Sequence, residues 1–80
     1  MPKLPVVSSK RIIKILERLG FEYAPKRGKG SHLAFVKRDK DTTRLVIVPD
    51  NRKGIPRGTL LAILEQAGLT KEKFIGLLKD

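Results

Sequence analysis

The chain has 80 residues, and 18 lysines and arginines against 8 aspartates and glutamates give it a formal net charge of +10. It contains no cysteine, which excludes disulfides and thiolate zinc sites, and one histidine with scattered carboxylates argues against a structural metal. This large excess of positive charge favours a nucleic-acid partner. An anionic membrane surface is the weaker alternative, because no basic amphipathic helix with bulky aromatics on its apolar face is visible.

The first predicted element is a helix. Residues 1–7 contain two prolines and are expected to form an extended lead-in. Ser8 or Ser9 can then act as N-cap, since a hydroxyl accepts a hydrogen bond from an otherwise unpaired helix amide. The helix is predicted over residues 9–19 and ends at Gly20, which tolerates positive φ. Its buried stripe is predicted to comprise Ile12, Ile13, Leu16 and Leu19, with Ile15 at the edge.

Three short strands are predicted next, over residues 21–24, 31–38 and 43–48, and Pro49 ends the third. Their connections are too short for crossover helices, which predicts an antiparallel meander. Side chains alternate between the faces of a strand. Leu33 and Phe35 therefore share one face, and His32, Ala34 and Val36 share the other.

The last third of the chain predicts a polar, basic loop over residues 50–57 and two more helices. One begins near Gly58-Thr59 and ends at Gly68, and Thr70 caps the other. The order α-β-β-β-α-α, with two amphipathic helices on one face of the sheet, predicts a two-layer α+β domain. We assign the aromatics Phe21, Tyr23, Phe35 and Phe74 to the core rather than to a base-stacking surface.

No apolar run approaches the roughly 18 residues of a membrane span. The proline-rich start is too short for a signal peptide. We therefore expect a single cytoplasmic domain over residues 1–80.

The only histidine, His32, directly follows a basic glycine loop at residues 26–30. The loop lacks the spacing of a nucleotide-binding P-loop and does not open a helix. Ser31 is a poor nucleophile for His32, because neighbouring side chains on a strand point to opposite faces. Metal-free RNA cleavage remains feasible, since RNA supplies its own 2′-hydroxyl nucleophile. An imidazole can then transfer protons, and fixed cations can stabilise the charged phosphorane.

Two groups of cations are candidates for binding RNA phosphates, one in the glycine loop and one before the second helix. Gly28 and Gly30 allow the backbone to approach a phosphate closely. The simpler alternative is that these cations only keep the surface soluble. The candidate RNA-binding residues are Lys26, Arg27, Lys29, Ser31, Arg52, Lys53 and Arg57, and His32 is the candidate catalytic residue.

Short strings with a specific order and spacing extend over nearly the whole chain. They are Pro2-Lys3-Leu4-Pro5, Leu19-Gly20-Phe21, Gly30-Ser31-His32, Val48-Pro49, Arg57-Gly58-Thr59-Leu60 and Gln66-Ala67-Gly68-Leu69-Thr70. In this order they resemble the HicA (YcfA-like) family of mRNA interferase toxins. The resemblance implies a double-stranded-RNA-binding-domain-like fold, α-β-β-β-α with a small terminal helix. It also implies ribosome-independent endoribonuclease activity on mRNA without a cofactor, and a HicB-like antitoxin that covers the active site.

The catalytic histidine of that family corresponds to His32. Family members often carry another histidine shortly after the Val-Pro that closes the third strand. Here this region is Asp50-Asn51-Arg52, so His32 is the single candidate for both proton transfers.

Two other classes of function remain open. One is a non-catalytic module of the same fold that binds double-stranded RNA by shape and backbone contacts. The start of the second long helix, Pro56-Arg57-Gly58-Thr59, is not the lysine-dense cluster expected of that module. The other is an interaction protein whose charge is matched by an acidic partner, which is compatible with a toxin–antitoxin pair.

Overall fold

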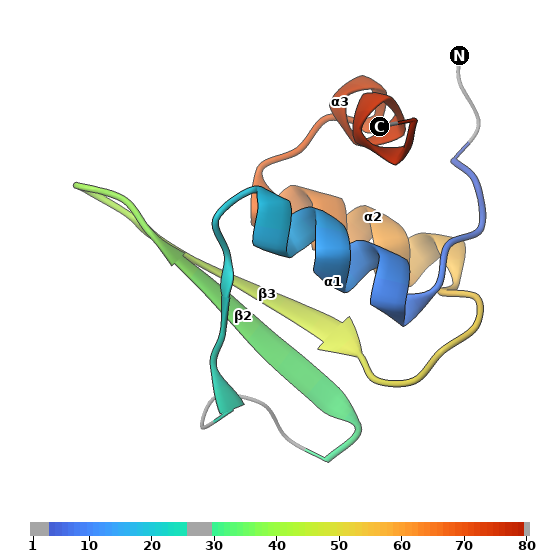
Figure 1. Ribbon diagram of the computed structural model, residues 1–80, viewed down its shortest axis with the longest axis horizontal. Coiled ribbons are helices and arrows are strands. Elements are labelled where there is room, and N and C mark those ends of the chain that lie inside the picture. Colours follow the sequence, from blue (N-terminus) through green and yellow to red (C-terminus); the bar gives the residue numbers. More distant parts are fainter. Residues whose placement is uncertain (1–3, 26–29, 80) are drawn as a thin grey trace.

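The computed structural model describes residues 4–25 and 30–79, which form three helices and three strands (Figure 1). The helices are α1 (Ser9–Arg18), α2 (Arg57–Ala67) and α3 (Lys71–Leu78). The strands are β1 (Glu22–Tyr23), β2 (His32–Arg38) and β3 (Thr43–Pro49). Their order is α-β-β-β-α-α, so the predicted α+β class is confirmed. Within the described ranges, no helix has the length and apolarity needed to cross a bilayer.

The strands form one antiparallel sheet in the order β1-β2-β3. His32 pairs with Pro49 at one end of the β2–β3 ladder, and Phe35 pairs with Val46 in the middle. Residues that face each other across an antiparallel pair lie on the same side of the sheet. Phe35 and Val46 therefore share one face and His32 lies on the other, which confirms the predicted meander and the predicted alternation along β2.

The hydrophobic core lies between the helices and one face of the sheet. The sheet contributes Phe35, Val46 and Val48, which all lie on the face opposite His32. All three helices also contribute buried side chains to this core: Ile12, Ile15 and Leu16 from α1, Leu60, Ile63, Leu64 and Ala67 from α2, and Phe74 from α3. Both longer helices therefore pack on the same face, as their amphipathic stripes predict.

The ends of the helices follow local sequence signals. The Ser8 hydroxyl accepts a hydrogen bond from the Arg11 amide at 3.2 Å, so Ser8 is the N-cap of α1. Gly68 ends α2 in the left-handed region, with φ of 74°. Thr70 caps α3 by accepting from the Lys73 amide at 3.1 Å. The second helix begins at Arg57 after Pro56, one residue earlier than predicted, because the rigid φ of proline suits a helix start.

The predicted buried stripe of α1 is wrong at three positions, one of which is Leu19, which is only partly buried. Ile15 is buried, with 4% of its surface exposed, whereas Ile13 is only partly buried. The residues that face the core follow the spacing i, i+3, i+4, and Ile13 lies to one side of that stripe. Ile13 instead lines a shallow hollow beside Leu33 and Phe35. This leaves an apolar side chain near the start of α1 accessible from outside.

The assignment of Tyr23 to the core is also wrong. Its side chain is 55% exposed, although its ring packs on Phe35 with 5.6 Å between the centroids. Tyr23 belongs to the two-residue edge strand β1, and strands at an edge have a neighbour on one side only. The three phenylalanines are buried as predicted.

Phe74 tests whether α3 is part of the folding unit. Its side chain is fully buried in the core, so Phe74→Ala is expected to lower the free energy of unfolding by about 3–5 kcal/mol. Chemical denaturation followed by circular dichroism measures this loss. The control is Lys73→Ala, an exposed position on the same helix, which should stay within about 0.5 kcal/mol of the parent. Equal stability of the two variants would show that α3 does not support the core.

Candidate active site

His32 is the first residue of β2 and its side chain is exposed. The amide of Asp50 donates a hydrogen bond to the carbonyl oxygen of Ser31 at 2.7 Å, which extends the pairing one residue beyond His32 and Pro49. The loop that follows β3 therefore leaves the sheet directly beside His32. Figure 1 shows that the start of β2, the end of β3 and the start of α1 lie toward the same side of the molecule.

Ser9 connects α1 to this end of the sheet. It is buried, with 1% of its surface exposed, and its hydroxyl donates to the carbonyl oxygen of Pro49 at 2.6 Å. The same hydroxyl accepts from the amide of Arg52 at 3.0 Å, and the amide of Ser9 donates to the carbonyl oxygen of Arg52 at 2.9 Å. One buried side chain thus holds the last residue of β3 and the following loop against α1.

This role of Ser9 was not predicted, because the two serines were treated as alternative caps. The structure gives them separate roles, since Ser8 caps the helix and Ser9 turns inward. The partners of the Ser9 hydroxyl are 40 and 43 residues away along the chain, so no local sequence pattern indicates them. The one indication in the sequence is the presence of two adjacent serines, since a helix needs only one of them as its N-cap.

The loop after β3 and the first turn of α1 enclose a pocket of about 250 Å³. Its wall contains Lys10 from α1 and Asp50, Arg52 and Lys53 from the loop. Asn51, in the middle of the loop, has φ of 54°. Asparagine adopts this left-handed conformation more readily than most residues, so the tight turn suits the sequence. The pocket combines three cations with one carboxylate, and Ile13 of α1 adds an apolar side chain to its wall.

The predicted site residues are therefore brought together only in part. Ser31, His32, Arg52 and Lys53 lie at the same end of the sheet. Arg57 is exposed at the first position of α2 and does not line the pocket. The predicted phosphate-binding residues Lys26, Arg27 and Lys29 lie outside the residues that the structure describes. Lys10, which lines the pocket, was not among the predicted residues, because it lies in the first helix and belongs to neither of the two predicted groups of cations.

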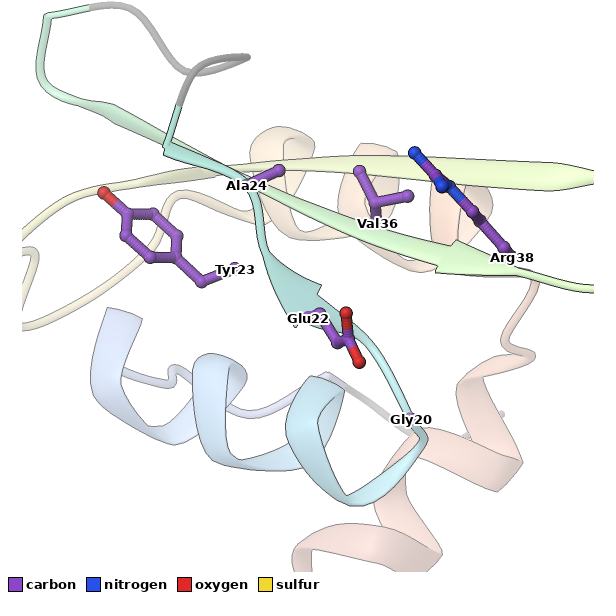
Figure 2. A pocket seen from close by; sticks show the side chains of 6 residues that line it. All are labelled: Gly20, Glu22, Tyr23, Ala24, Val36 and Arg38. Atoms are coloured by element: carbon purple, nitrogen blue, oxygen red, sulfur yellow. The ribbon is translucent and has the colours of Figure 1, made fainter.

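A larger hollow of about 480 Å³ lies elsewhere, at the β1 edge of the sheet (Figure 2). Glu22 and Arg38 bring one negative and one positive charge to it, and Val36 adds an apolar wall. Figure 2 shows Tyr23 pointing away from Val36 and Arg38. His32 does not line this hollow, and its charges do not favour an anion. The smaller pocket is lined by Asp50, whose amide is bonded to Ser31, and it carries more positive than negative side chains.

The arrangement beside His32 suits proton transfer near a phosphate. An exposed imidazole can accept and return a proton, and neighbouring cations can stabilise charge that develops on phosphate oxygens. Among residues 4–25 and 30–79, no group of three histidine, cysteine, aspartate or glutamate side chains is arranged to hold a metal ion. The described side chains at this end of the sheet thus offer acid–base and electrostatic chemistry.

Comparison with protein families gives a match. A family model described as the HicA toxin of bacterial toxin–antitoxin systems matches residues 9–69, which is more than half of the chain. The matched region runs from the first residue of α1 to just beyond α2 and includes Ser9, His32 and the loop after β3. No curated protein matches the chain.

The Ser9 connection can be tested by its effect on stability. Ser9→Ala removes a donor from the Pro49 carbonyl and an acceptor from the Arg52 amide, so we expect a loss of about 1–3 kcal/mol in unfolding free energy. Ser31→Ala, at an exposed hydroxyl beside the same loop, serves as control and should change stability by less than about 0.5 kcal/mol.

Amide hydrogen exchange supplies a local measurement for the same pair of variants. The Arg52 amide should lose protection in Ser9→Ala, because its acceptor is gone. A Ser9→Ala protein that keeps both its stability and the protection of this amide would contradict the connecting role.

Proposed function

The chain belongs to the HicA family, the toxins of bacterial toxin–antitoxin systems, and on this premise we propose that it is an endoribonuclease that cleaves mRNA without a metal or a ribosome. The observation that carries the proposal is the placement of His32. The only histidine of the chain is exposed at the start of β2, beside a basic loop, and lies within the matched residues. That position gives a long RNA strand access to the imidazole.

The proposed reaction uses RNA as its own nucleophile. The His32 imidazole accepts the proton of a 2′-hydroxyl, and that oxygen attacks the adjacent phosphorus. The bond from phosphorus to the 5′-oxygen breaks, and a proton delivered by the imidazolium, by a lysine or by water neutralises the leaving oxygen. The products are a 2′,3′-cyclic phosphate and a 5′-hydroxyl. Acid–base catalysis of this kind contributes about 10²–10⁴-fold to the rate.

Cations around His32 are proposed to bind the phosphates of the RNA. Arg52 and Lys53 lie in the loop that begins at Asp50, whose amide is bonded to Ser31, and Arg57 extends the basic surface to the start of α2. Ser31 positions the approach to His32 through its carbonyl bond to the Asp50 amide. Lys26, Arg27 and Lys29 belong to the proposal on the strength of the sequence alone, as a basic loop that immediately precedes the histidine. The proposed substrate places the protein in the cytoplasm.

A HicB-like antitoxin is the proposed protein partner. The net charge of +10 favours an acidic partner surface, because opposite charges steer association. Since His32 is exposed, a partner that covers this end of the sheet would block access of RNA to the imidazole.

The catalytic role of His32 is tested by substitution in the presence of EDTA. We expect the purified parent protein to cleave RNA under these conditions, and His32→Ala to lower the cleavage rate by at least about 10²-fold, because a proton carrier is lost. RNA binding should be retained, since the cations are unchanged. Lys71→Ala, which lies on α3, is the control and should cleave at the parental rate.

Two outcomes would contradict this assignment. Cleavage by His32→Ala at the parental rate in a nuclease-free preparation would exclude His32 as catalyst. A parent protein that binds RNA with strong salt dependence but leaves it intact would instead indicate the non-catalytic RNA-binding module.

The proposed partner is tested by co-expression with the product of the neighbouring reading frame. We expect the two proteins to purify together and the partner to suppress both RNA cleavage and growth arrest. The complex should weaken as salt is raised, since charge complementarity is screened. A neighbouring product that neither purifies with the chain nor relieves its toxicity would exclude this antitoxin.

A further inference from the structure

We propose that the pocket between α1 and the β3–α2 loop binds one phosphate of the RNA backbone next to the scissile phosphate, with Lys10, Arg52 and Lys53 as its ligands. This inference rests on the proposed function, since it assigns a second contact on the same substrate. The pocket has a volume of about 250 Å³ and its cations come from two elements that are far apart in the sequence. We call it the flanking phosphate site.

The cations of the flanking phosphate site are available to a ligand. Lys10, Arg52 and Lys53 are exposed, and their side chains form no hydrogen bond or ion pair with the part of the chain that the structure describes. Arg11, their neighbour on α1, differs because its guanidinium donates to the carbonyl oxygen of Leu78. The free donors thus gather at the pocket, while a neighbouring cation is used to hold α3.

The site is also preorganised. Ser9 fixes the backbone of Arg52 through two hydrogen bonds, one accepted by its hydroxyl and one donated by its amide. The hydroxyl bond to the Pro49 carbonyl fixes the beginning of the same loop. A loop that is already held in place loses less conformational freedom when it binds, so each contact contributes more to affinity. Arg52 is therefore presented from a fixed backbone, Lys53 directly follows it, and Lys10 comes from a regular helix.

The position of the pocket relative to His32 determines which phosphate it binds. Asp50, which lines the pocket, is bonded through its amide to Ser31, the residue before His32. An RNA strand whose scissile phosphate lies at the imidazole, on the open face of the sheet, reaches the pocket by continuing around this end of the sheet toward α1. Asp50 is the single carboxylate in the wall, so the side chains leave a net charge of about +2. This carboxylate limits how tightly the phosphate is held.

The test measures binding separately from cleavage. A 2′-O-methyl RNA lacks the nucleophilic hydroxyl and stays intact, so its affinity can be measured by fluorescence anisotropy over a range of salt concentrations. The variant carries Lys10→Gln together with Lys53→Gln. We expect weaker binding and a salt dependence, log K against log salt, that is shallower by about 0.7 for each lost phosphate contact.

The control variant carries Lys40→Gln together with Lys73→Gln and loses the same charge. Lys40 lies in the turn between β2 and β3, at the other end of the sheet, and Lys73 lies on α3. We expect its salt dependence to stay close to that of the parent. A second variant, Asp50→Asn, keeps the amide bond to Ser31 and should bind the RNA more tightly, because a repulsive charge is removed.

The outcomes distinguish this site from the proposed function. If the Lys10 and Lys53 variant and the control variant show the same salt dependence, or if Asp50→Asn does not tighten binding, the flanking phosphate site is wrong. On cleavable RNA the pocket variant should raise KM and leave kcat unchanged, as expected for a contact made equally before and during the reaction. If the parent protein cleaves no RNA, the proposed endoribonuclease function is excluded. The binding measurements would still test whether the flanking phosphate site exists.

Discussion

The buried hydroxyl of Ser9 is the interaction on which the rest of this end of the molecule depends. It joins α1 to the last residue of β3 and to the loop beyond it, and it leaves neither the Pro49 carbonyl nor the Arg52 amide unpaired. A buried polar group without a partner is destabilising. The hydrogen bonds of the Ser9 hydroxyl therefore form only when α1, the end of β3 and the following loop fold together. The loop that carries Arg52 and Lys53 is thereby placed beside the first residue of β2.

The fold separates the part of the protein that supplies stability from the part that can meet a ligand. The sheet residues Phe35, Val46 and Val48 lie on one face and belong to one buried cluster with residues of all three helices. His32 is on the opposite face, at the end of the ladder, where pairing with Pro49 is the last step before the loop. Because the core side chains of the sheet lie on the face covered by the helices, the imidazole and the loop cations can be exposed at the end of the sheet without disturbing the core. A polyanion can therefore approach this end while the helices stay packed.

Much of the fold was predictable from the sequence because its signals are local. The helix caps at Ser8 and Thr70, the glycine that ends α2 and the alternation along β2 all depend on neighbours a few residues away. The errors occurred where burial depends on distant neighbours. Ile15 and Ile13 exchange roles because the sheet determines how α1 is rotated, and Tyr23 stays exposed because β1 is an edge strand. Helical spacing and residue type alone do not contain that information.

The sequence by itself determined the order of the elements, the large positive charge and the fact that His32 is the only imidazole. These are properties of composition and of short-range patterns. Only the tertiary structure decided that Lys10 meets Arg52 and Lys53 in one pocket, and that Asp50 in its wall is bonded to Ser31, the residue before His32. The physical reason is the span of the contacts involved, since Ser9 is bonded across 40 and 43 residues. Such contacts arise only when the helices close over the sheet and bury the hydroxyl between them.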